Sequence, residues 1–547
     1  MAVRFFPQQK TRWVEREKVS LIDFDLKPED LEAYLDEYLV GQREAKGILA
    51  TKICTHFHRV KYFLERGERF DEVGFVKNNI IIIGPTGVGK TFMIKLIARR
   101  IGVPFVKGDA TKFSETGYVG GDVEDLIRDL VQEAEGNVDK ARFGIVYLDE
   151  IDKIASSGHI VGPDVSRTGV QRALLKPLEE TEVELRVPHD PITQMEAIEY
   201  YRRTGRRKRN TINTRYILFI ASGAFSGLEE IIRKRLHKQK LGFLSEIQER
   251  EDMKINYLRF VIPEDLIAYG FESEFVGRFP VITVFDPLSE EDLYAILANP
   301  NSVIVVSKKR DFRAYGIDLA FTDEALRRMA SLASRENTGA RALSRVLERV
   351  LIPFEKALPS TRLSYLGVTP EMVEDPEGVL REMRSNPENP RWREWYARAR
   401  REEEERLREF LLQRKKIFFE QYKFPFTPAK LDLVLKLHRK EDLDPQQALE
   451  EILMLWRQIR SFEKSFERRT GIRIAFSEEA RDLILDEVLK RDEGVYAFCD
   501  RILSILEYGL KLVQDRTGKK LFELPGEAVK SPESFLNRLV STSYRLD

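Results

Sequence analysis

Two patterns of apolar residues alternate along the first half of the chain. In residues 27–62 apolar side chains recur about every 3.6 residues, with a break at Val40–Gly41, so this segment predicts two helices. Continuous apolar runs then follow, separated by helical segments, at 79–83, 103–109, 144–150 and 215–223. Such runs are typical of parallel strands that are buried on both faces. The predicted fold class is therefore α/β, with a parallel sheet covered by helices.

From about residue 288 the pattern becomes mainly helical. Within this half, residues 390–420 form a highly charged helix candidate. A run of this kind is typical of a solvated helical face, and a protein-binding or coiled arm is the alternative.

The C-terminal part of the chain contains an internal repeat. Residues 315–326 match residues 470–481 at six of twelve positions, and residues 373–380 resemble residues 529–536. The two matches have nearly the same spacing, which favours a duplicated small domain over coincidence.

These patterns predict five segments. We expect an N-terminal arm at 1–26, a large α/β domain at 27–287, a small helical domain at 288–385, a charged helical region at 386–465 and a degenerate repeat of the small domain at 466–547.

Composition excludes several classes of protein. The 547 residues carry 90 Lys and Arg against 90 Asp and Glu, which argues against a protein that coats nucleic acid. Two cysteines, Cys54 and Cys499, form neither a disulfide framework nor a Cys-rich zinc site. We find no signal peptide and no apolar stretch long enough for a membrane span. A cytoplasmic, multidomain protein without a membrane partner is expected.

The first motif with a chemical meaning is the glycine-rich segment Gly84–Thr91, which follows an apolar strand and opens a helix. This is the P-loop pattern, in which backbone N–H groups and the helix N-terminus bind phosphate oxygens. Lys90 is expected to reach the β- and γ-phosphates, and the Thr91 hydroxyl to bind Mg²⁺. ATP and Mg²⁺ are therefore the predicted cofactors.

A pair of carboxylates ends the strand at 144–150. We expect Asp149 to hold Mg²⁺ through water, and Glu150 to orient and polarise the water that attacks the γ-phosphate. Alone, such a pair could simply cap the next helix, but after a P-loop it indicates nucleotide hydrolysis.

Residues 27–385 resemble the AAA+ unfoldases ClpX and HslU. The resemblance is carried by GPTGVGKT at 84–91, ATKFSETGYVGGDVEDLIRDL at 110–130, GIVYLDEIDKI at 144–154, GPDVSRTGVQRALL at 162–175, ILFIASGAF at 217–225, PEDLIAYGFESEFVGRFPV at 263–281 and NTGARALSRVLE at 337–348. It implies an ATP-driven protein unfoldase that works as a ring, usually a hexamer, and threads protein substrates through a central pore.

The resemblance also implies residue roles. The segment containing Val40 and Gly41 matches the part that contacts adenine, and Arg278 matches the arginine finger that acts on the neighbouring subunit's nucleotide. Arg341 matches the sensor-2 arginine, and Ser222 lies near the sensor-1 position. Catalysis is assigned to Glu150, Arg278 and Lys90. The predicted ATP-binding residues are Val40, Gly41, Pro85, Thr86, Gly87, Val88, Gly89, Lys90, Thr91, Phe92 and Arg341.

Three loops are matched to contacts with other molecules. Tyr118 and Val119, between two glycines, resemble the pore loop that grips substrate by area contact, and a tight turn with a packed tyrosine is the alternative. The basic loop is interpreted as the substrate entrance, with nucleic-acid binding or plain solvation as alternatives; its residues are Arg206, Arg207, Lys208 and Arg209. Leu241, Gly242 and Phe243 resemble the tripeptide with which ClpX docks on a ClpP-like peptidase, or could fold back on the domain.

The chain also departs from the family pattern. The Cys₄ zinc domain of ClpX is absent from this sequence, and residues 386–547 extend beyond the resemblance. The repeat aligns Tyr496 with Arg341 and has no P-loop, so we expect it to bind no nucleotide and to serve as a scaffold or interaction region. A remodelling chaperone without a peptidase is the alternative function, and a DNA-acting AAA+ motor is a more distant one.

Overall fold

A computed structural model describes residues 24–66, 77–113, 123–156, 165–185, 202, 211–240, 256–413, 424–441, 445–491 and 493–544. The chain divides into two compact units, Met1–Leu293 with Ala333–Ala342, and Tyr294–Leu332 with Leu343–Asp547. Each unit is described by itself.

The first unit is built on a five-stranded sheet with the order β2-β3-β6-β1-β7, in which all paired strands are parallel. Its strands are β1 (Ile80–Ile83), β2 (Phe105–Asp109), β3 (Ile145–Asp149), β6 (Leu218–Gly223) and β7 (Val281–Val284). The first four coincide with the predicted apolar runs. The α/β class and the parallel sheet are confirmed.

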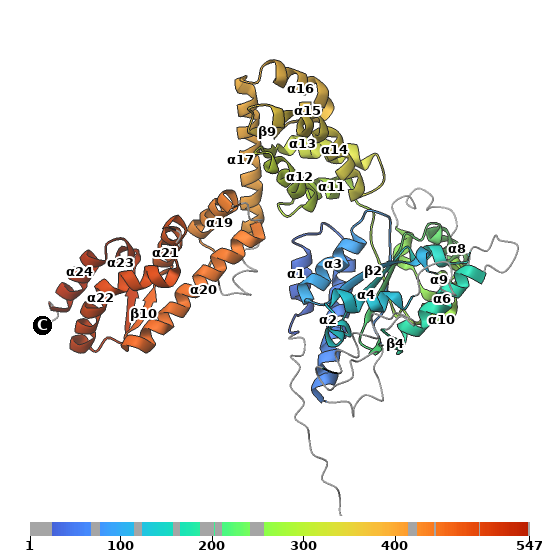
Figure 1. Ribbon diagram of the computed structural model, residues 1–547, viewed down its shortest axis with the longest axis horizontal. Coiled ribbons are helices and arrows are strands. Elements are labelled where there is room, and N and C mark those ends of the chain that lie inside the picture. Colours follow the sequence, from blue (N-terminus) through green and yellow to red (C-terminus); the bar gives the residue numbers. More distant parts are fainter. Residues whose placement is uncertain are drawn as a thin grey trace, which may run out of the picture. The chain divides into compact units, whose positions relative to one another are not determined.

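Helices cover both faces of this sheet (Figure 1). One face packs against α1 (Pro28–Leu35), α2 (Arg43–Arg66) and α3 (Lys90–Ile101). The other face packs against α4 (Asp125–Glu133), α6 (Val165–Leu178), α8 (Leu228–Lys240), α9 (Pro263–Tyr269) and α10 (Ser273–Gly277). Because β1 is buried at every position, its sequence is Ile-Ile-Ile-Ile rather than an alternation of apolar and polar residues.

Short elements complete the first unit. They are η2 (Ala110–Lys112), α5 (Val138–Ala141), η3 (Ile151–Ile154), η5 (Tyr257–Phe260) and the antiparallel pair β4 (Glu182–Glu184) and β5 (Thr211–Asn213). This pair and the edge strand β7 were not predicted. Strand β7 lies between Pro280 and Pro287, so only a short apolar run marks it in the sequence.

A buried histidine makes the first unit sensitive to acid. His56 on α2 donates its Nε2–H to the carbonyl oxygen of Tyr216 at 3.0 Å, and burial lowers the pKa of His56 to about 4. The unfolded chain binds this proton near pH 6.5, whereas the folded chain does so only near pH 4. The free energy of unfolding should therefore fall by about 3 kcal/mol as the pH drops through this window.

His56→Gln should remove most of this pH dependence, because glutamine carries no titrating group. Urea unfolding at pH 4 to 7, followed by hydrogen exchange of peptides from α2 and β6, would measure it. His58→Gln on the same helix is the control for changing a histidine. An unchanged slope in His56→Gln would contradict the assignment.

The second unit begins with a small helical domain. Its elements are the end of α11 (Glu290–Ala298), α12 (Val303–Ala314), β8 (Asp318–Phe321), α13 (Asp323–Ser334), α14 (Ala340–Ala357), η6 (Leu358–Ser360), β9 (Tyr365–Val368), α15 (Pro370–Glu374) and α16 (Pro376–Ser385). Residues 333–342 of this stretch belong to the first unit. Strands β8 and β9 pair in parallel.

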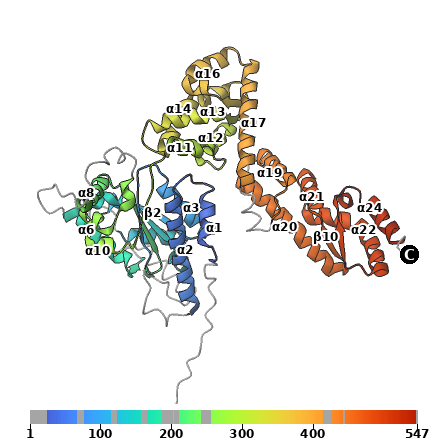
Figure 2. The ribbon, with the colours of Figure 1, turned by 180° about the vertical axis from the view of Figure 1, so that it is seen from behind.

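Helix α17 (Pro390–Gln413) packs directly on these two strands, as Figures 1 and 2 show. A Cβ atom added to Gly367 of β9 would lie 2.4 Å from the backbone nitrogen of Tyr396, so the two backbones are in contact. Glu402 and Glu403 accept hydrogen bonds from the main-chain N–H groups of Asp323 and Phe321, at 2.7 and 2.9 Å. The charged helix predicted at 390–420 is therefore more than a solvated face, because some of its carboxylates bind the backbone of the small domain.

The last part of the chain repeats this order of elements. It contains α19 (Pro428–Glu441), α20 (Pro445–Thr470), β10 (Arg473–Phe476), α21 (Glu478–Arg491), α22 (Val495–Thr517), β11 (Leu521–Leu524), α23 (Gly526–Lys530) and α24 (Pro532–Tyr544). Strands β10 and β11 pair in parallel, as β8 and β9 do. From β10 to α24 the succession of strands and helices matches that from β8 to α16, so the two repeated sequences fold alike.

Burial corrects one alignment within the repeat. Six of the seven buried residues of α14 have a buried counterpart 156 positions later in α22, and Leu351, which matches the half-buried Glu507, is the exception; the pairs are Ala342 and Phe498, Leu343 and Cys499, Val346 and Ile502, Leu347 and Leu503, Val350 and Leu506, Phe354 and Leu510. Arg341 therefore corresponds to Ala497, not to Tyr496 as predicted, because the repeat gains one residue after Val488, which still matches Ala333 at a spacing of 155 positions. Neither Tyr496 nor Ala497 is an arginine, so the repeat still has no counterpart of Arg341, and the expectation that it binds no nucleotide is unchanged.

Candidate functional site

The P-loop connects the buried strand β1 to helix α3, and its shape depends on two glycines. Gly87 and Gly89 have φ angles of 78° and 96°, which side chains with a Cβ atom rarely adopt. Lys90, at the start of α3, donates from Nζ to the carbonyl oxygens of Gly84 at 2.6 Å and Pro85 at 2.8 Å. The lysine is thus turned back over the loop, as phosphate binding between the loop and the ammonium group requires.

Burial and nearby charged residues shift the pKa of Lys90. Burial lowers the pKa of Lys90 to about 8, and the positive charge of Arg341 acts in the same direction, while Asp149 and Asp152 oppose the shift. An ammonium group that has lost much of its hydration binds an anion more strongly than one in water. The N-cap residue Gly89 has no side chain to cap the first N–H groups of α3. Both features suit a polyphosphate.

A chain of hydroxyl groups links the P-loop to Asp149. Thr91 Oγ1 donates to Tyr147 Oη at 3.1 Å, Tyr147 Oη and Ser222 Oγ lie 2.6 Å apart, and Ser222 Oγ donates to Asp149 Oδ1 at 2.8 Å. The other oxygen of Asp149 contacts Lys107 Nζ at 2.7 Å. The carboxyl ends of β2, β3 and β6 therefore bring together residues that are far apart in sequence.

This arrangement keeps Asp149 ionised. Burial alone would raise the pKa of Asp149, but the hydrogen bonds from Lys107 and Ser222 outweigh it, so the pKa lies below its usual value. Burial also raises the pKa of Tyr147 to about 12, which keeps the phenol protonated. Asp149 is thus a carboxylate that could share a hard cation with the nearby Thr91 hydroxyl.

Glu150 follows in an unusual backbone conformation. Its φ and ψ angles are 57° and 33°, a left-handed geometry that is costly for a residue other than glycine, and its side chain is exposed. Its N–H donates to Asp149 Oδ1 at 3.1 Å. The exposed side chain of Glu150 therefore takes no part in the chain of hydroxyl groups that ends at Asp149.

The residues before α14 lie against the P-loop. The N–H of Ala340 donates to the carbonyl oxygen of Gly87 at 2.8 Å, and a Cβ atom added to Gly87 would lie 2.2 Å from the carbonyl oxygen of Thr338. Arg341 is the next residue and is exposed. The backbone contact explains why Arg341 influences Lys90 although 251 positions separate them in the sequence.

Gly339→Ala should disturb this junction. Gly339 has a φ angle of 60°, and an added Cβ atom would lie 2.7 Å from the carbonyl oxygen of Gly87, so the P-loop or α14 must move. We expect nucleotide affinity to fall about tenfold, measured by calorimetric titration, since tenfold corresponds to about 1.4 kcal/mol. Gly136→Ala is the matched control, because Gly136 has a φ of 76° with open space around it. Equal affinities in the two variants would contradict the proposed role of the junction.

The segment that contains Val40 and Gly41 also lies beside the P-loop. Leu39 is within 3.0 Å of the position that a Cβ atom on Gly89 would occupy. Gln42 accepts from the N–H of Asp286 at 2.8 Å and donates to its carbonyl oxygen at 2.7 Å, which ties this segment to the end of β7. Of the other predicted residues around the loop, Val88 is buried, Pro85 and Phe92 are half-buried, and Thr86 is exposed.

Arg278 lies at the amino ends of the strands, opposite the ends from which the P-loop starts. It follows α10 and precedes β7, and its carbonyl oxygen accepts a hydrogen bond at 3.0 Å from Asn79, the residue before β1. The P-loop begins at the other end of β1, about 13 Å away by the rise of a four-residue strand. The guanidinium of Arg278 contacts Glu179 and borders a cavity of about 340 Å³. In its own chain, Arg278 is therefore remote from Lys90.

The other predicted sites lie outside the described residues. These are the pore loop with Tyr118 and Val119, the basic loop with Arg206, Arg207, Lys208 and Arg209, and the docking tripeptide Leu241, Gly242 and Phe243. Within the ranges that the structure describes, no group of three or more His, Cys, Asp or Glu side chains could hold a metal ion, and no helix could span a membrane.

Sequence reasoning missed several members of the site. Lys107, Tyr147 and Asn79 were given no role in the sequence analysis, although Tyr147 lies within the motif at 144–154. Lys107 lies two residues before the end of β2, in register with Tyr147 of β3. Only the strand order puts its ammonium group beside Asp149.

Comparison with known proteins agrees with this geometry. Residues 76–282 match the AAA domain of the Cdc48 subfamily, and residues 288–354 match the C-terminal D2-small domain of ClpB. The chain is 38% identical over 361 residues to the ATP-dependent Clp protease ATP-binding subunit ClpX 3 of Methylococcus capsulatus, covering 64% of this chain and 80% of that protein. The chain belongs to the ClpX family.

A second ClpX relative, from Borrelia duttonii, is 39% identical over 341 residues, which cover 61% of this chain and 75% of the relative. This ClpX-family chain is thus an AAA+ ATPase that binds and hydrolyses ATP, of the ATP-dependent Clp unfoldase type. The likeness to HslU stays a prediction.

Proposed function

We propose that copies of this ClpX-family chain form a ring, most simply a hexamer, which hydrolyses ATP to pull protein substrates through a central pore. The observation that carries the proposal is the position of Arg278. The cation that the hydrolysis reaction needs lies one strand length from the P-loop of its own chain. A neighbouring copy can supply this cation if the amino ends of the strands in one chain face the P-loop of the next chain.

Each step of hydrolysis has a candidate residue in the first unit. The P-loop N–H groups and Lys90 bind the β- and γ-phosphates. Thr91 and Asp149 are the residues that would hold Mg²⁺, which neutralises phosphate charge when bound. Glu150 accepts a hydrogen bond from the attacking water and polarises it. Arg278 of the neighbouring copy stabilises the charge that develops on the γ-phosphoryl oxygens.

The contact of Glu179 with Arg278 fits this arrangement. Glu179 binds the guanidinium of Arg278 while no phosphate is near. A triphosphate on the neighbouring copy would compete with Glu179 for this guanidinium, because it carries more negative charge. The backbone of Gly339 and Ala340 contacts the P-loop and holds Arg341 next to it. Arg341 thereby couples the bound nucleotide to α14.

Tyr118 tests the link between hydrolysis and substrate movement. Tyr118→Ala should retain most ATP turnover but unfold a tagged fluorescent protein at least tenfold more slowly, because an alanine offers little contact area to a threaded chain. Tyr62→Ala, which removes an exposed tyrosine from α2, is the control. Undiminished unfolding in Tyr118→Ala would rule out a gripping role.

Phe243 distinguishes delivery to a peptidase from remodelling alone. If the chain docks on a ClpP-like peptidase, Phe243→Ala should abolish degradation of the reporter while unfolding continues. If the chain acts without a peptidase, the wild type should unfold the reporter and a ClpP ring should add no degradation.

The basic loop at 206–209 is proposed to attract acidic or carboxylate-ended substrates, which predicts weaker substrate binding at high salt.

A further inference from the structure

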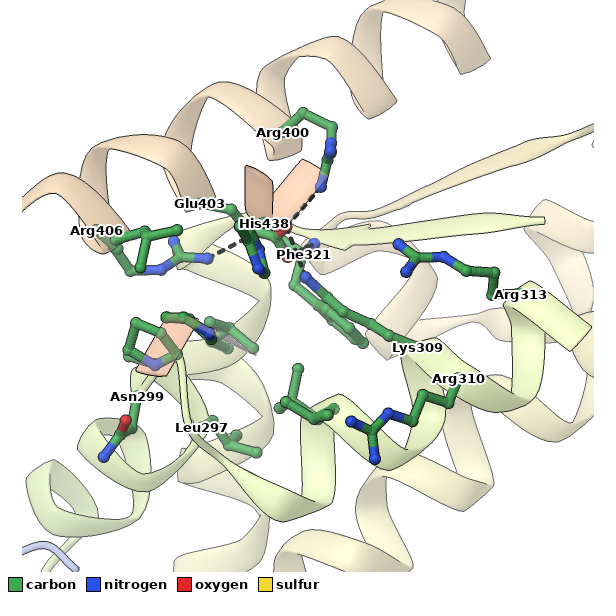
Figure 3. Close-up of a pocket in the computed structure, with 17 residues that line it drawn as sticks. Leu297, Asn299, Lys309, Arg310, Arg313, Phe321, Arg400, Glu403, Arg406 and His438 are labelled. Carbon is green, nitrogen blue, oxygen red and sulfur yellow. Dashed lines mark hydrogen bonds and ion pairs between the residues drawn. The ribbon is translucent and has the colours of Figure 1, made fainter. Parts of the chain in front are cut away.

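A cavity in the second unit is explained by the fold. Its volume is about 90 Å³, and residues of the small domain and of the C-terminal region line it. Figure 3 shows the contacts of Glu403 on α17 with Lys309 of α12 and with Arg400, at 2.7 and 3.8 Å. Arg406 donates to the carbonyl oxygen of Phe321 in β8 at 3.1 Å. These contacts attach α17 to the small domain, so this charged lining has a structural role.

A cavity in the first unit borders Arg278, the residue proposed to act on a neighbouring copy. Its volume is about 340 Å³, and its lining includes Asn79, Leu178, Glu179 and Arg278. The residue before β1, the end of α6 and the residue after α10 meet here. A side chain that ties these three segments together therefore fixes the position of Arg278.

Asn79 is the side chain that ties them together. It is 1% exposed and directly precedes β1. Its Nδ2 group donates to the carbonyl oxygen of Arg278 at 3.0 Å and to that of Leu178 at 3.4 Å. Its Oδ1 atom accepts from the N–H of Phe219 in β6 at 3.2 Å. Because the amide group has two N–H donors and one carbonyl oxygen, Asn79 uses all of its polar groups in binding main chain.

The two carbonyl groups that Asn79 binds belong to the two sides of one ion pair. Arg278 contacts Glu179 through its guanidinium, and Leu178 directly precedes Glu179. A single amide therefore holds the main chain on both sides of the contact between Arg278 and Glu179. The same residue leads into β1, whose other end begins the P-loop at Gly84.

The end of α6 is held firmly as well. The last four carbonyl groups of a helix have no partner within the helix and need one elsewhere. In α6 all four have a partner; residues 175, 176, 177 and 178 accept from Glu179 N at 3.1 Å, Thr181 Oγ1 at 2.7 Å, Lys77 Nζ at 3.2 Å and Asn79 Nδ2 at 3.4 Å. Glu179 thus follows a helix end whose main chain is fixed, which sets the direction from which it meets Arg278.

We propose that Asn79 is a positioning residue for Arg278, because it holds the main chain of Arg278 and Glu179 where the guanidinium can reach the nucleotide of a neighbouring copy. This inference rests on the proposed action of Arg278 on that neighbour. Asn79 lies at the end of β1 away from the P-loop, so it acts through Arg278 and not on the phosphates of its own chain. A misplacement of about 1 Å can cost about 10²-fold in rate.

Asn79→Ala should lower the kcat of ATP hydrolysis at least tenfold, while the affinity for ATP stays within about threefold of the wild type. Phosphate release measures kcat, and calorimetric titration with a non-hydrolysable analogue measures affinity. Asn137→Ala is the control, because Asn137 also binds main chain in this unit, where it accepts from the N–H of Lys140 at 3.0 Å and caps α5. Its kcat should match that of the wild type.

Two further measurements separate positioning from a general effect on the fold. The double variant Asn79→Ala with Arg278→Ala should be no slower than Arg278→Ala alone, since a positioning residue has no effect once the residue it positions is absent. A mixture of Asn79→Ala with Lys90→Ala should recover part of the wild-type turnover, because Lys90→Ala supplies a correctly held Arg278 to the intact P-loop of its partner.

The outcomes distinguish this inference from the proposed function. Normal turnover in Arg278→Ala would overturn both. Loss of turnover in Arg278→Ala with wild-type turnover in Asn79→Ala, or a further loss in the double variant, would overturn the role of Asn79 alone. If Asn79→Ala does not bind ATP, Asn79→Ser, which keeps a hydroxyl group, is measured by the same criteria. Loss of ATP binding in both would also overturn this role, because the amide would then be required for the fold.

Discussion

Replacing Glu150 with glutamine should leave ATP binding intact and lower ATP turnover by about 10²- to 10⁴-fold. The amide keeps the size of the side chain but cannot polarise the attacking water. The strained, left-handed backbone at Glu150 positions this side chain away from Asp149, so the substitution leaves the ion pair and hydroxyl chain of Asp149 in place.

Phosphate release gives the turnover of Glu150→Gln, and calorimetry gives its affinity for ATP. Glu135→Gln is the matched control, because Glu135 is also an exposed glutamate with a φ angle of 56°. Turnover within about threefold of the wild type in Glu150→Gln would contradict the role assigned to Glu150. A parallel loss in Glu135→Gln would indicate a general effect of changing such residues.

Arg278→Ala should lower ATP turnover by about 10³-fold or more, the effect typical of an arginine finger. The reason is the loss of a guanidinium from the γ-phosphoryl oxygens of the neighbouring copy, so the affinity of the altered chain for its own nucleotide should change little. Arg172→Ala is the control, because Arg172 forms an exposed ion pair with Glu272 in the same region.

A mixing experiment distinguishes action on a neighbour from action within the chain. Lys90→Ala retains Arg278 but lacks the P-loop lysine, and Arg278→Ala retains the P-loop but lacks the arginine. Each variant alone should be nearly inactive, and their mixture should recover part of the wild-type turnover. A mixture as inactive as its components would contradict the proposed assembly.

The sheet was predictable from the sequence where burial on both faces leaves a continuous apolar run. The runs at 79–83 and 215–223 became β1 and β6, the central strands. Strand β7 at the edge was missed because Pro280 and Pro287 bound it closely and leave only a short apolar run. The P-loop was predictable because its chemistry uses consecutive residues.

The surroundings of Asp149 were not predictable in the same way. Lys107 and Ser222 reach Asp149 because β2 and β6 flank β3, and this order is a property of the whole sheet. For Arg278 the resemblance predicts action on a neighbour; the structure shows only that it precedes a strand that runs parallel to β1, at the end of that strand away from the P-loop.

Helix α17 shows another limit of pattern reading. A run of glutamates and arginines indicates a solvated surface, and no sequence pattern marks Glu402 and Glu403 as acceptors for the backbone of β8 and α13. Trp392 and Ala399 are buried on the same helix. A truncation that tests the C-terminal region should therefore retain α17 and begin after residue 413.

The most direct test of the central claim is unfolding of a tagged, folded fluorescent protein by the purified chain, without any peptidase. The account predicts that fluorescence falls with time in the presence of ATP, that it persists with a non-hydrolysable analogue, and that Glu150→Gln abolishes the loss. Normal ATP turnover with unchanged reporter fluorescence would contradict it, because hydrolysis would then not be coupled to movement of a polypeptide.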